Sequence, residues 1–248
     1  MSNEINPYVK KVLIGTPCYS EVKNEYVSGL FTTTKKIPDM IAHCFEIGNN
    51  FIDDARNSIV DAFMQIDELS HLLFIDSDIS FKSADVIDLI KYANEERKIV
   101  SGVYPRQNID YGYIAQLLQE GCPPEDLAKF SGHVDSFGFA PIHKNSDLTE
   151  PVEVYHCMTG FMLIDKNVFL EMKNSDLGLL EYQNRDGFLS TQFFKTSLHK
   201  EHGYLGEDIN FCHMYRSIGG KVWLLSWVNV GHSGSYVYER KIANRLEV

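Results

Sequence analysis

The chain has 248 residues, and its 34 Asp plus Glu against 23 Lys plus Arg give a formal net charge of -11. So acidic a chain, in which no run of Lys or Arg exceeds two residues, lacks the basic surface that nucleic acids and anionic membranes require, and we expect no nucleic-acid partner. Hydrophobic residues make up 44% of the chain, which is ample for one substantial core. Its apolar runs are far shorter than the roughly 20 residues that span a bilayer, and the N-terminus lacks a signal-peptide core. We therefore expect no transmembrane segment and a cytoplasmic location.

The five cysteines are widely spaced and form no CxxC pair, which favours reduced thiols over a disulfide framework or a cysteine zinc site. The nine histidines are scattered as well, with no HExxH pair. Any metal site must therefore combine carboxylates with a distant histidine.

The first part of the chain alternates between strand-like and helix-like patterns, which is typical of an α/β fold built on a mostly parallel sheet. Apolar runs predict buried strands at 12–15, 71–75 and 99–103. Helical periodicity predicts helices at 26–45, with an interruption at Pro38, at 52–66 and at 83–95. A loop that begins Gly-Thr-Pro follows the first strand.

Residues 106–150 are less regular, and we interpret them as an insertion or a set of loops on the same domain. Beyond them the pattern predicts strands at 152–155 and 160–164, a helix at 165–172, a helix at 206–217 and a last strand at 221–226. No internal repeat is visible. We expect one domain over residues 1–248.

The most informative segment places two carboxylates directly after a buried strand. Asp76 and Asp78 follow the apolar run 71–75, and open α/β sheets bind ligands at the carboxyl ends of their strands. Carboxylate oxygens are natural ligands of Mg2+ or Mn2+, ions that keep positions open for substrate phosphates. Taken alone, this DxD pattern fits a solvated turn equally well.

A second group lies in the first turns of the helix predicted at 52–66. Arg56 is at the edge of the apolar face of this helix, and Asn57 is on the opposite side. A guanidinium near a helix N-terminus is unfavourable against the helix dipole, which favours a purpose such as gripping a phosphate or a base. Local pairing with Asp53 or Asp54 explains Arg56 equally well.

A third group, Glu207 and Asp208, opens the helix predicted at 206–217, where acids offset the helix dipole. Because the two acids flank the apolar face of this helix, we expect them to point inward. A half-buried carboxylate has a raised pKa and can act as a general base. Late in the chain, His232 is presented from a loop between Gly231 and Gly234.

Taken in order, these segments resemble the GT-A glycosyltransferases, the nucleotide-sugar-dependent class with a DxD motif and a Rossmann-like domain, of a family 2-like type. Six motifs within residues 12–236 carry the resemblance, namely Gly15-Thr16-Pro17, Ala55-Arg56-Asn57, Asp76-Ser77-Asp78, residues 159–164, Gly206-Glu207-Asp208 and His232. The resemblance implies a GT-A Rossmann-like single domain whose mostly parallel central sheet is flanked by helices. Its nucleotide-binding half would lie at about 10–105 and its acceptor-side half at about 106–240.

The resemblance also implies roles for individual residues. Nucleotide contacts would come from Thr16, Pro17, Tyr19, Arg56, Asn57, Asp76 and Ser77. A Mn2+ or Mg2+ ion would be held by Asp76, Asp78 and His232, and Gly160 and Phe161 would line the sugar or acceptor side. In inverting relatives the second acid of the ED pair deprotonates the acceptor hydroxyl, which points to Asp208 as the base and to Glu207 as a ligand of sugar hydroxyls. The aromatic-rich segment that often precedes the ED pair is replaced here by residues 202–205.

The function implied by the resemblance is metal-dependent transfer of a sugar from a UDP- or GDP-type nucleotide-diphospho-sugar donor to a saccharide or glycan acceptor. Two alternatives stay open on the residues alone. One is a haloacid-dehalogenase-like phosphatase, whose apolar strand and DxD are nearly matched by residues 74–80, although its motif normally opens the chain. The other is a nucleotide-sugar or carbohydrate-binding protein that keeps the fold without turnover.

Overall fold

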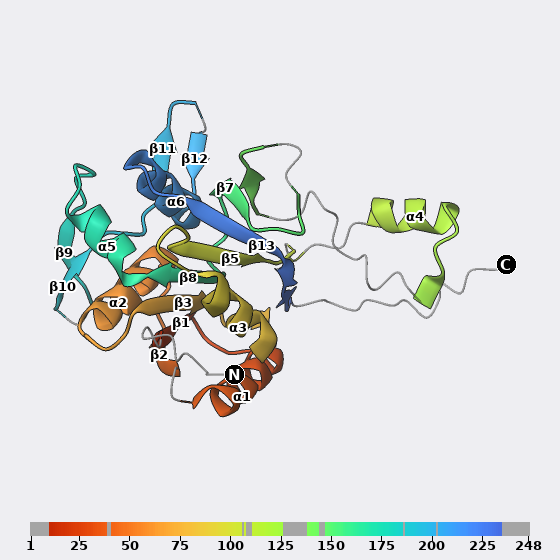
Figure 1. Ribbon diagram of the computed structural model, residues 1–248, viewed down its shortest axis with the longest axis horizontal. Helices are drawn as coiled ribbons and strands as arrows, with labels where there is room; N and C mark the ends of the chain where they lie inside the picture. Colours follow the sequence, from red (N-terminus) through yellow and green to blue (C-terminus); the bar gives the residue numbers. More distant parts are fainter. Residues whose placement is uncertain are drawn as a thin grey trace, which may run out of the picture.

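The computed structural model describes residues 10–38, 41–105, 107, 111–125, 138–143, 147–185, 187–201 and 203–234. Within these ranges, an eight-stranded sheet forms the centre of the molecule (Figure 1). Its strands, in spatial order, are β2 (Ile41–Ile47), β1 (Val12–Cys18), β3 (His71–Ile75), β8 (Phe161–Asp165), β5 (Ile99–Val103), β13 (Val222–Asn229), β7 (Val152–His156) and β6 (Ala140–Pro141).

The sheet is mostly parallel. Strands β1, β2, β3, β5 and β13 run in one direction, whereas β8 is antiparallel to β3 and β5, and β7 is antiparallel to β13. The predicted α/β fold class, a mainly parallel sheet flanked by helices, is therefore confirmed, and it is consistent with a GT-A-like Rossmann fold.

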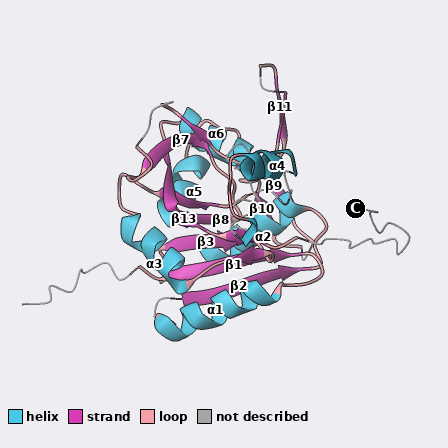
Figure 2. Ribbon diagram, turned by 90° about the vertical axis from the view of Figure 1, so that its right-hand side faces the viewer, coloured by secondary structure: helices cyan, strands magenta, loops and turns pink. Residues whose placement is uncertain are grey.

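Helices cover both faces of this sheet. One layer holds α1 (Asn24–Lys36) and α3 (Ser83–Tyr92), and the other holds α2 (Ile52–Met64), α5 (Lys166–Lys173) and α6 (Glu207–Ser217). Successive side chains of β3 alternate between the two cores, since Leu72 and Phe74 pack in one and Leu73 and Ile75 in the other. Figure 2 shows α1 along the edge strand β2. Because both faces of the inner strands are covered, their sequences read as continuous apolar runs.

Close packing of α2 on β1 depends on a glycine. A Cβ added at Gly15 would lie 2.4 Å from Cγ2 of Ile59 on α2. The absence of a side chain at this position lets the helix approach the strand, and this approach sets where the N-terminal turns of α2 lie against the edge of the sheet.

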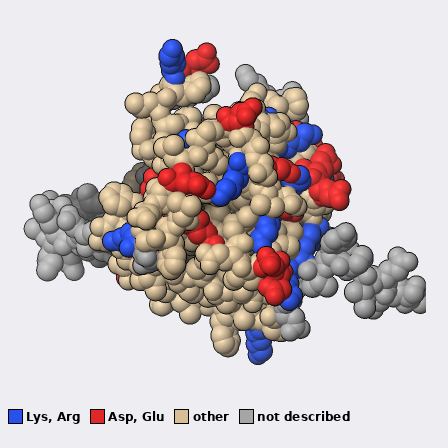
Figure 3. Space-filling model, turned by 90° about the vertical axis from the view of Figure 1, so that its left-hand side faces the viewer, with Lys and Arg blue, Asp and Glu red and all other residues tan. Residues whose placement is uncertain are grey.

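Smaller elements extend from the sheet. Two hairpins pair β9 (Glu181–Gln183) with β10 (Leu189–Thr191) and β11 (Ser197–His199) with β12 (Gly203–Leu205), and β4 (Ile79–Ser80) pairs with β14 (Gly231–His232). The β11–β12 hairpin projects beyond α6 (Figure 1). On the face drawn in Figure 3, Lys and Arg side chains are interspersed with Asp and Glu side chains. No helix among the described residues is both long and apolar enough to cross a membrane.

One predicted element is wrong in part. The helix expected at 26–45 ends with α1 at Lys36, and residues from Ile41 form β2, which pairs in parallel with β1. Pro38 lacks a backbone N–H and cannot continue the helix. The residues that follow alternate between exposed side chains, such as Phe45, and partly buried ones, such as Cys44, which is the pattern of an edge strand.

Other elements also differ from the prediction in their boundaries or type. The irregular region 106–150 contains a helix, α4 (Tyr111–Gln119), which buries none of its residues and lies apart from the sheet (Figure 1). The first strand continues to Cys18 instead of ending at residue 15, and the last strand reaches Asn229. His232 lies in the short strand β14 and not in a loop. The predictions for residues 108–110, 126–137, 144–146, 202 and 235–236 fall outside the described residues.

The start of β3 carries a buried histidine that links the fold to pH. His71 lies 2.8 Å from the Ser70 hydroxyl through Nδ1 and 3.6 Å from Oδ2 of Asp165 through Nε2. Burial lowers the pKa of His71 to about 4, although Asp165 opposes the shift. The folded protein therefore keeps this ring neutral at pH values where the unfolded chain, with a pKa of about 6.5, takes up a proton.

Because the unfolded state binds the extra proton, stability is fully present above about pH 6.5 and falls as the pH drops toward 4. We expect His71→Gln to lose less stability over this window than the parent protein, with a difference on the order of 2 kcal/mol. Urea unfolding near pH 7 and near pH 4.5 measures it. His199→Gln, at an exposed position, is the control and should decline like the parent. Equal declines in the parent protein and His71→Gln would contradict this assignment.

Candidate active site

Asp76 lies at the carboxyl end of β3, at the edge where parallel strands place ligand-binding residues. Its backbone N–H donates to the carbonyl of Gly160 at 3.0 Å, and its own carbonyl accepts from Ile79 at 3.0 Å. A Cβ added at Gly160 would lie 2.6 Å from Oδ2 of Asp76. The position of the Asp76 carboxylate thus depends on the turn before β8, where only glycine fits.

A buried guanidinium joins Asp76 to the acids of α6. Arg56 is 3% exposed, with Nη1 3.1 Å from Oδ1 of Asp76, Nη2 3.2 Å from Oδ2, and Nε 3.3 Å from Oε1 of Glu207. It also lies over the ring of Phe74, 5.3 Å from the centroid. Burial by itself would lower the pKa of Arg56, but the two carboxylates outweigh it and leave that pKa raised. The cation is therefore permanent, and it holds together groups 131 residues apart (207 minus 76).

The two acids of α6 differ in their partners. Glu207 is held by Arg56, whereas the Asp208 carboxylate accepts the N–H of Ile209 at 2.7 Å, within the first turn of the helix. Burial raises the pKa of both carboxyl groups, and Arg56 opposes the shift in each. The expectation that both acids point inward agrees with this burial.

Asp78 and His232 form a second polar pair beside this cluster. Nε2 of His232 lies 3.3 Å from Oδ2 of Asp78, and Nδ1 of the same ring lies 2.9 Å from the carbonyl of Pro105. Because a carbonyl only accepts, Nδ1 carries a proton, and a hydrogen bond from the ring to the Asp78 carboxylate places a second proton on Nε2. Burial would lower the pKa of His232, but Asp78 and the Pro105 carbonyl leave it raised. Burial would raise the pKa of Asp78, but the hydrogen bond and charge of His232 leave it lowered.

Asp78 and His232 supply one oxygen and one nitrogen of the kind that bind a divalent cation, and such an ion would need further ligands. Adjacent ligands of an octahedral ion at about 2.1 Å lie about 3 Å apart, close to the spacing between the Asp78 oxygen and the His232 nitrogen. The carbonyl behind Nδ1 is the partner that metal-binding histidines usually have. Within the described ranges no group of three or more His, Cys, Asp or Glu is placed to hold a metal ion. Asp76, expected as a ligand, has its carboxylate on Arg56 instead.

Three residues that the sequence predicts to contact the nucleotide or the sugar, Thr16, Asn57 and Phe161, are buried and contact other parts of the protein. The hydroxyl of Thr16, which belongs to β1, lies 2.5 Å from that of Tyr26, and Phe161 packs against Phe81. The amide of Asn57 donates to the carbonyl of Phe194 at 2.9 Å and accepts its N–H at 2.8 Å. We assign these side chains supporting roles.

The buried position of Asn57 corrects the helical-wheel expectation, which put it opposite the apolar face. The segment that carries Phe194 and the β9–β10 hairpin pack on that side of α2. A wheel shows which side of a helix is polar, but not whether another segment covers it.

The other predicted residues lie nearer the edge of the sheet. Pro17 is in β1 beside Glu46 of β2, and Tyr19 follows that strand with 64% of its surface exposed. Ser77 is in the turn between Asp76 and Asp78, where its carbonyl accepts the N–H of Lys23 at 2.9 Å. The structure thus brings together Arg56, Asp76, Glu207 and Asp208, with Asp78 and His232 beside them.

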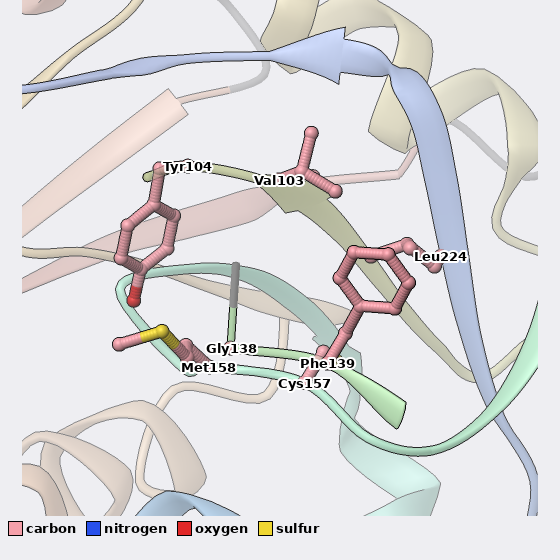
Figure 4. A pocket seen from close by; sticks show the side chains of 8 residues that line it. Val103, Tyr104, Gly138, Phe139, Cys157, Met158 and Leu224 are labelled. Atoms are coloured by element: carbon pink, nitrogen blue, oxygen red, sulfur yellow. The ribbon is translucent and has the colours of Figure 1, made fainter. Parts of the chain in front are cut away.

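Two further residues of this site, Tyr104 and Gln107, follow β5 and were not among the predicted ones. Oη of Tyr104 accepts the N–H of Gly160 at 2.9 Å, and Gln107 donates to Oδ2 of Asp78 at 2.8 Å. Figure 4 shows Tyr104 at the end of β5 with its hydroxyl directed toward the turn that carries Met158. The rule that points to Asp76, that ligand-binding residues follow parallel strands, applies equally to the residues after 99–103.

No protein-family model matches the chain, and no curated protein matches it. Among solved structures, the fold is similar to that of A197 from STIV, with a TM-score of 0.50 and 14% sequence identity, over 93% of this chain and 98% of that one. A second match is GalNAc-T7, solved with UDP, GalNAc and Mn2+. Its TM-score is 0.45 at 11% identity, and the match covers 92% of this chain and 38% of that one. The likeness to A197 concerns the fold alone.

Proposed function

We propose that the protein is a metal-dependent glycosyltransferase that moves a sugar from a nucleotide-diphospho-sugar to a saccharide or glycan acceptor. The observation that carries this proposal is the single guanidinium of Arg56, which contacts both Asp76 of the DxD segment and Glu207 of the ED pair. Two motifs that resemble those of one enzyme class, far apart in the chain, therefore meet at one edge of the sheet.

The donor side of the proposed site consists of Asp78, His232 and Arg56. Asp78 and His232 would hold Mn2+ or Mg2+ together with the diphosphate oxygens, and the ion supplies Lewis-acid stabilisation of the leaving nucleoside diphosphate. The Arg56 cation offsets part of the charge of the neighbouring acids, and a diphosphate could approach them only when the metal ion offsets the rest. The nucleotide would lie over the ends of β1 and β3, near Tyr19 and Ser77.

The acceptor side assigns different roles to the two acids of α6. Because Glu207 is paired with Arg56, its carboxylate is a poor base and a suitable acceptor of sugar hydroxyl hydrogen bonds. Asp208 accepts the N–H of Ile209, and within the described residues no ion pair joins it to Arg56, so its carboxylate, whose pKa burial raises, is the better base. It would take the proton of the acceptor hydroxyl as that oxygen bonds to the anomeric carbon and the bond to the diphosphate breaks, with inversion.

The phosphatase alternative is less well supported. A haloacid-dehalogenase-like enzyme uses the first carboxylate of its DxD as a nucleophile, and here the corresponding Asp76 is held by Arg56 through both carboxylate oxygens. A nucleophile held in this way must give up two charged contacts before it reacts. Assays still separate the classes, because a phosphatase releases inorganic phosphate, a transferase releases nucleoside diphosphate, and a binding protein releases neither.

Asp78→Asn should remove metal-dependent donor binding, because the variant keeps the shape of the side chain and loses its charge. Thermal shifts with UDP-, GDP-, CMP- and dTDP-sugars, each with and without Mn2+, measure this. The parent protein should be stabilised only when Mn2+ and one type of nucleotide are both present, by about 2.7 kcal/mol at a ligand concentration of 100 times Kd. Asp67→Asn, at an exposed site, should behave like the parent. Normal metal and donor binding by Asp78→Asn would refute the metal assignment.

Asp208→Asn should keep donor binding and lose transfer. An amide cannot accept the acceptor proton, so the rate of nucleoside diphosphate release in the presence of acceptor should fall by about 10²- to 10⁴-fold. Asp176→Asn, at an exposed position, is the matched control. A variant that transfers sugar at the parental rate would show that Asp208 is not the base.

A further inference from the structure

Three residues after β5, namely Tyr104, Pro105 and Gln107, contact every part of the proposed donor site except Arg56. We call them the β5 support segment. We propose that this segment positions the Asp78–His232 pair for a cation and that Gln107 is its principal positioning residue. The inference rests on the proposed function for its cation, but the contacts that carry it belong to this chain alone.

The first contact fixes the histidine. The carbonyl of Pro105 lies 2.9 Å from Nδ1 of His232, and the rings of His232 and Tyr104 meet edge to face, with centroids 5.2 Å apart and an interplanar angle of 82°. The hydrogen bond keeps a proton on Nδ1, and the ring contact limits rotation of the imidazole. Nε2 therefore faces Asp78 before any cation arrives.

The second contact fixes the carboxylate. Nε2 of Gln107 donates to Oδ2 of Asp78 at 2.8 Å and to the carbonyl of Ser233 at 2.9 Å. The N–H of Ser233 in turn donates to the carbonyl of Asp78 at 2.8 Å. One amide group thus ties the residue after His232 to the same oxygen that faces the imidazole.

The third contact extends the support to the other carboxylate of the DxD segment. Tyr104 is 4% exposed, and its hydroxyl accepts the N–H of Gly160, whose carbonyl accepts the N–H of Asp76. A cavity of about 10 Å³ between Tyr104 and Phe139 has room for no more than one water molecule, so the ring is closely packed (Figure 4). Burial, followed by the charge of Asp76, raises the pKa of the phenol, which stays neutral.

Gln107 can be tested without disturbing the fold, because its side chain is exposed. Gln107→Leu keeps the approximate size and loses both hydrogen bonds. Partners that orient metal ligands typically contribute 10- to 100-fold to metal affinity, so we expect the affinity for Mn2+, measured by electron paramagnetic resonance with inorganic pyrophosphate present, to fall by about 10-fold or more. Gln116→Leu is the matched control, because that amide also donates to a carboxylate, Glu120, at 2.8 Å, and it should bind Mn2+ like the parent.

A second readout needs no metal. In the parent protein, nitrogen-15 NMR of the histidine rings should show an Nδ1 proton of His232 that is protected from solvent exchange, assigned by its loss in His232→Gln. In Gln107→Leu this proton should exchange faster, because the chain at Ser233 is no longer tied to Asp78. Unchanged exchange and unchanged Mn2+ affinity would overturn the inference. If the parent protein bound no Mn2+, the proposed function would fail, and the exchange rates alone would decide the role of Gln107.

Discussion

The buried ion cluster of Arg56 with Asp76 and Glu207 is the constraint on which the rest of the site depends. A guanidinium that is 3% exposed has lost its hydration, and its ion pairs with the two carboxylates compensate for that loss. Removing one partner of such a buried pair typically costs about 3–5 kcal/mol. The N-terminal turns of α2 and α6 and the end of β3 are therefore held at fixed separations. The Asp78–His232 pair and Asp208 lie close to this cluster.

The charge of this cluster decides which ligands it can bind. The chain carries a net charge of -11, and four of its acids gather at one edge of the sheet. Among the described residues, Arg56 is the only cation that forms an ion pair with Asp76 or Glu207. A site of this composition repels anions unless a further cation is bound. The metal dependence that we propose therefore agrees with the charge of this site.

The sequence predicts well those elements whose burial in the fold matches their own pattern of apolar residues. Strands β3 and β5 and helix α2 match their predicted positions closely, because they are buried on both faces or have one continuous apolar face. β2 was missed because an edge strand that packs on one face has no continuous apolar run. The acids of the site follow from their places at element ends. Tyr104 and Gln107 also follow a parallel strand, but no local pattern predicts that they contact Gly160 and Asp78.

The antiparallel strand β8 has a consequence for how the chain reaches this structure. It lies between β3 and β5, so the sheet of the first half stays open until residues beyond 160 have been synthesised. A fragment that ends at residue 105 would expose unpaired edges on both strands, which are templates for aggregation. Pairing over so long a separation in sequence also slows folding. The sheet strands of residues 10–105 therefore do not complete their pairing alone. The ribosome must first synthesise β8, which lies in the second half of the chain.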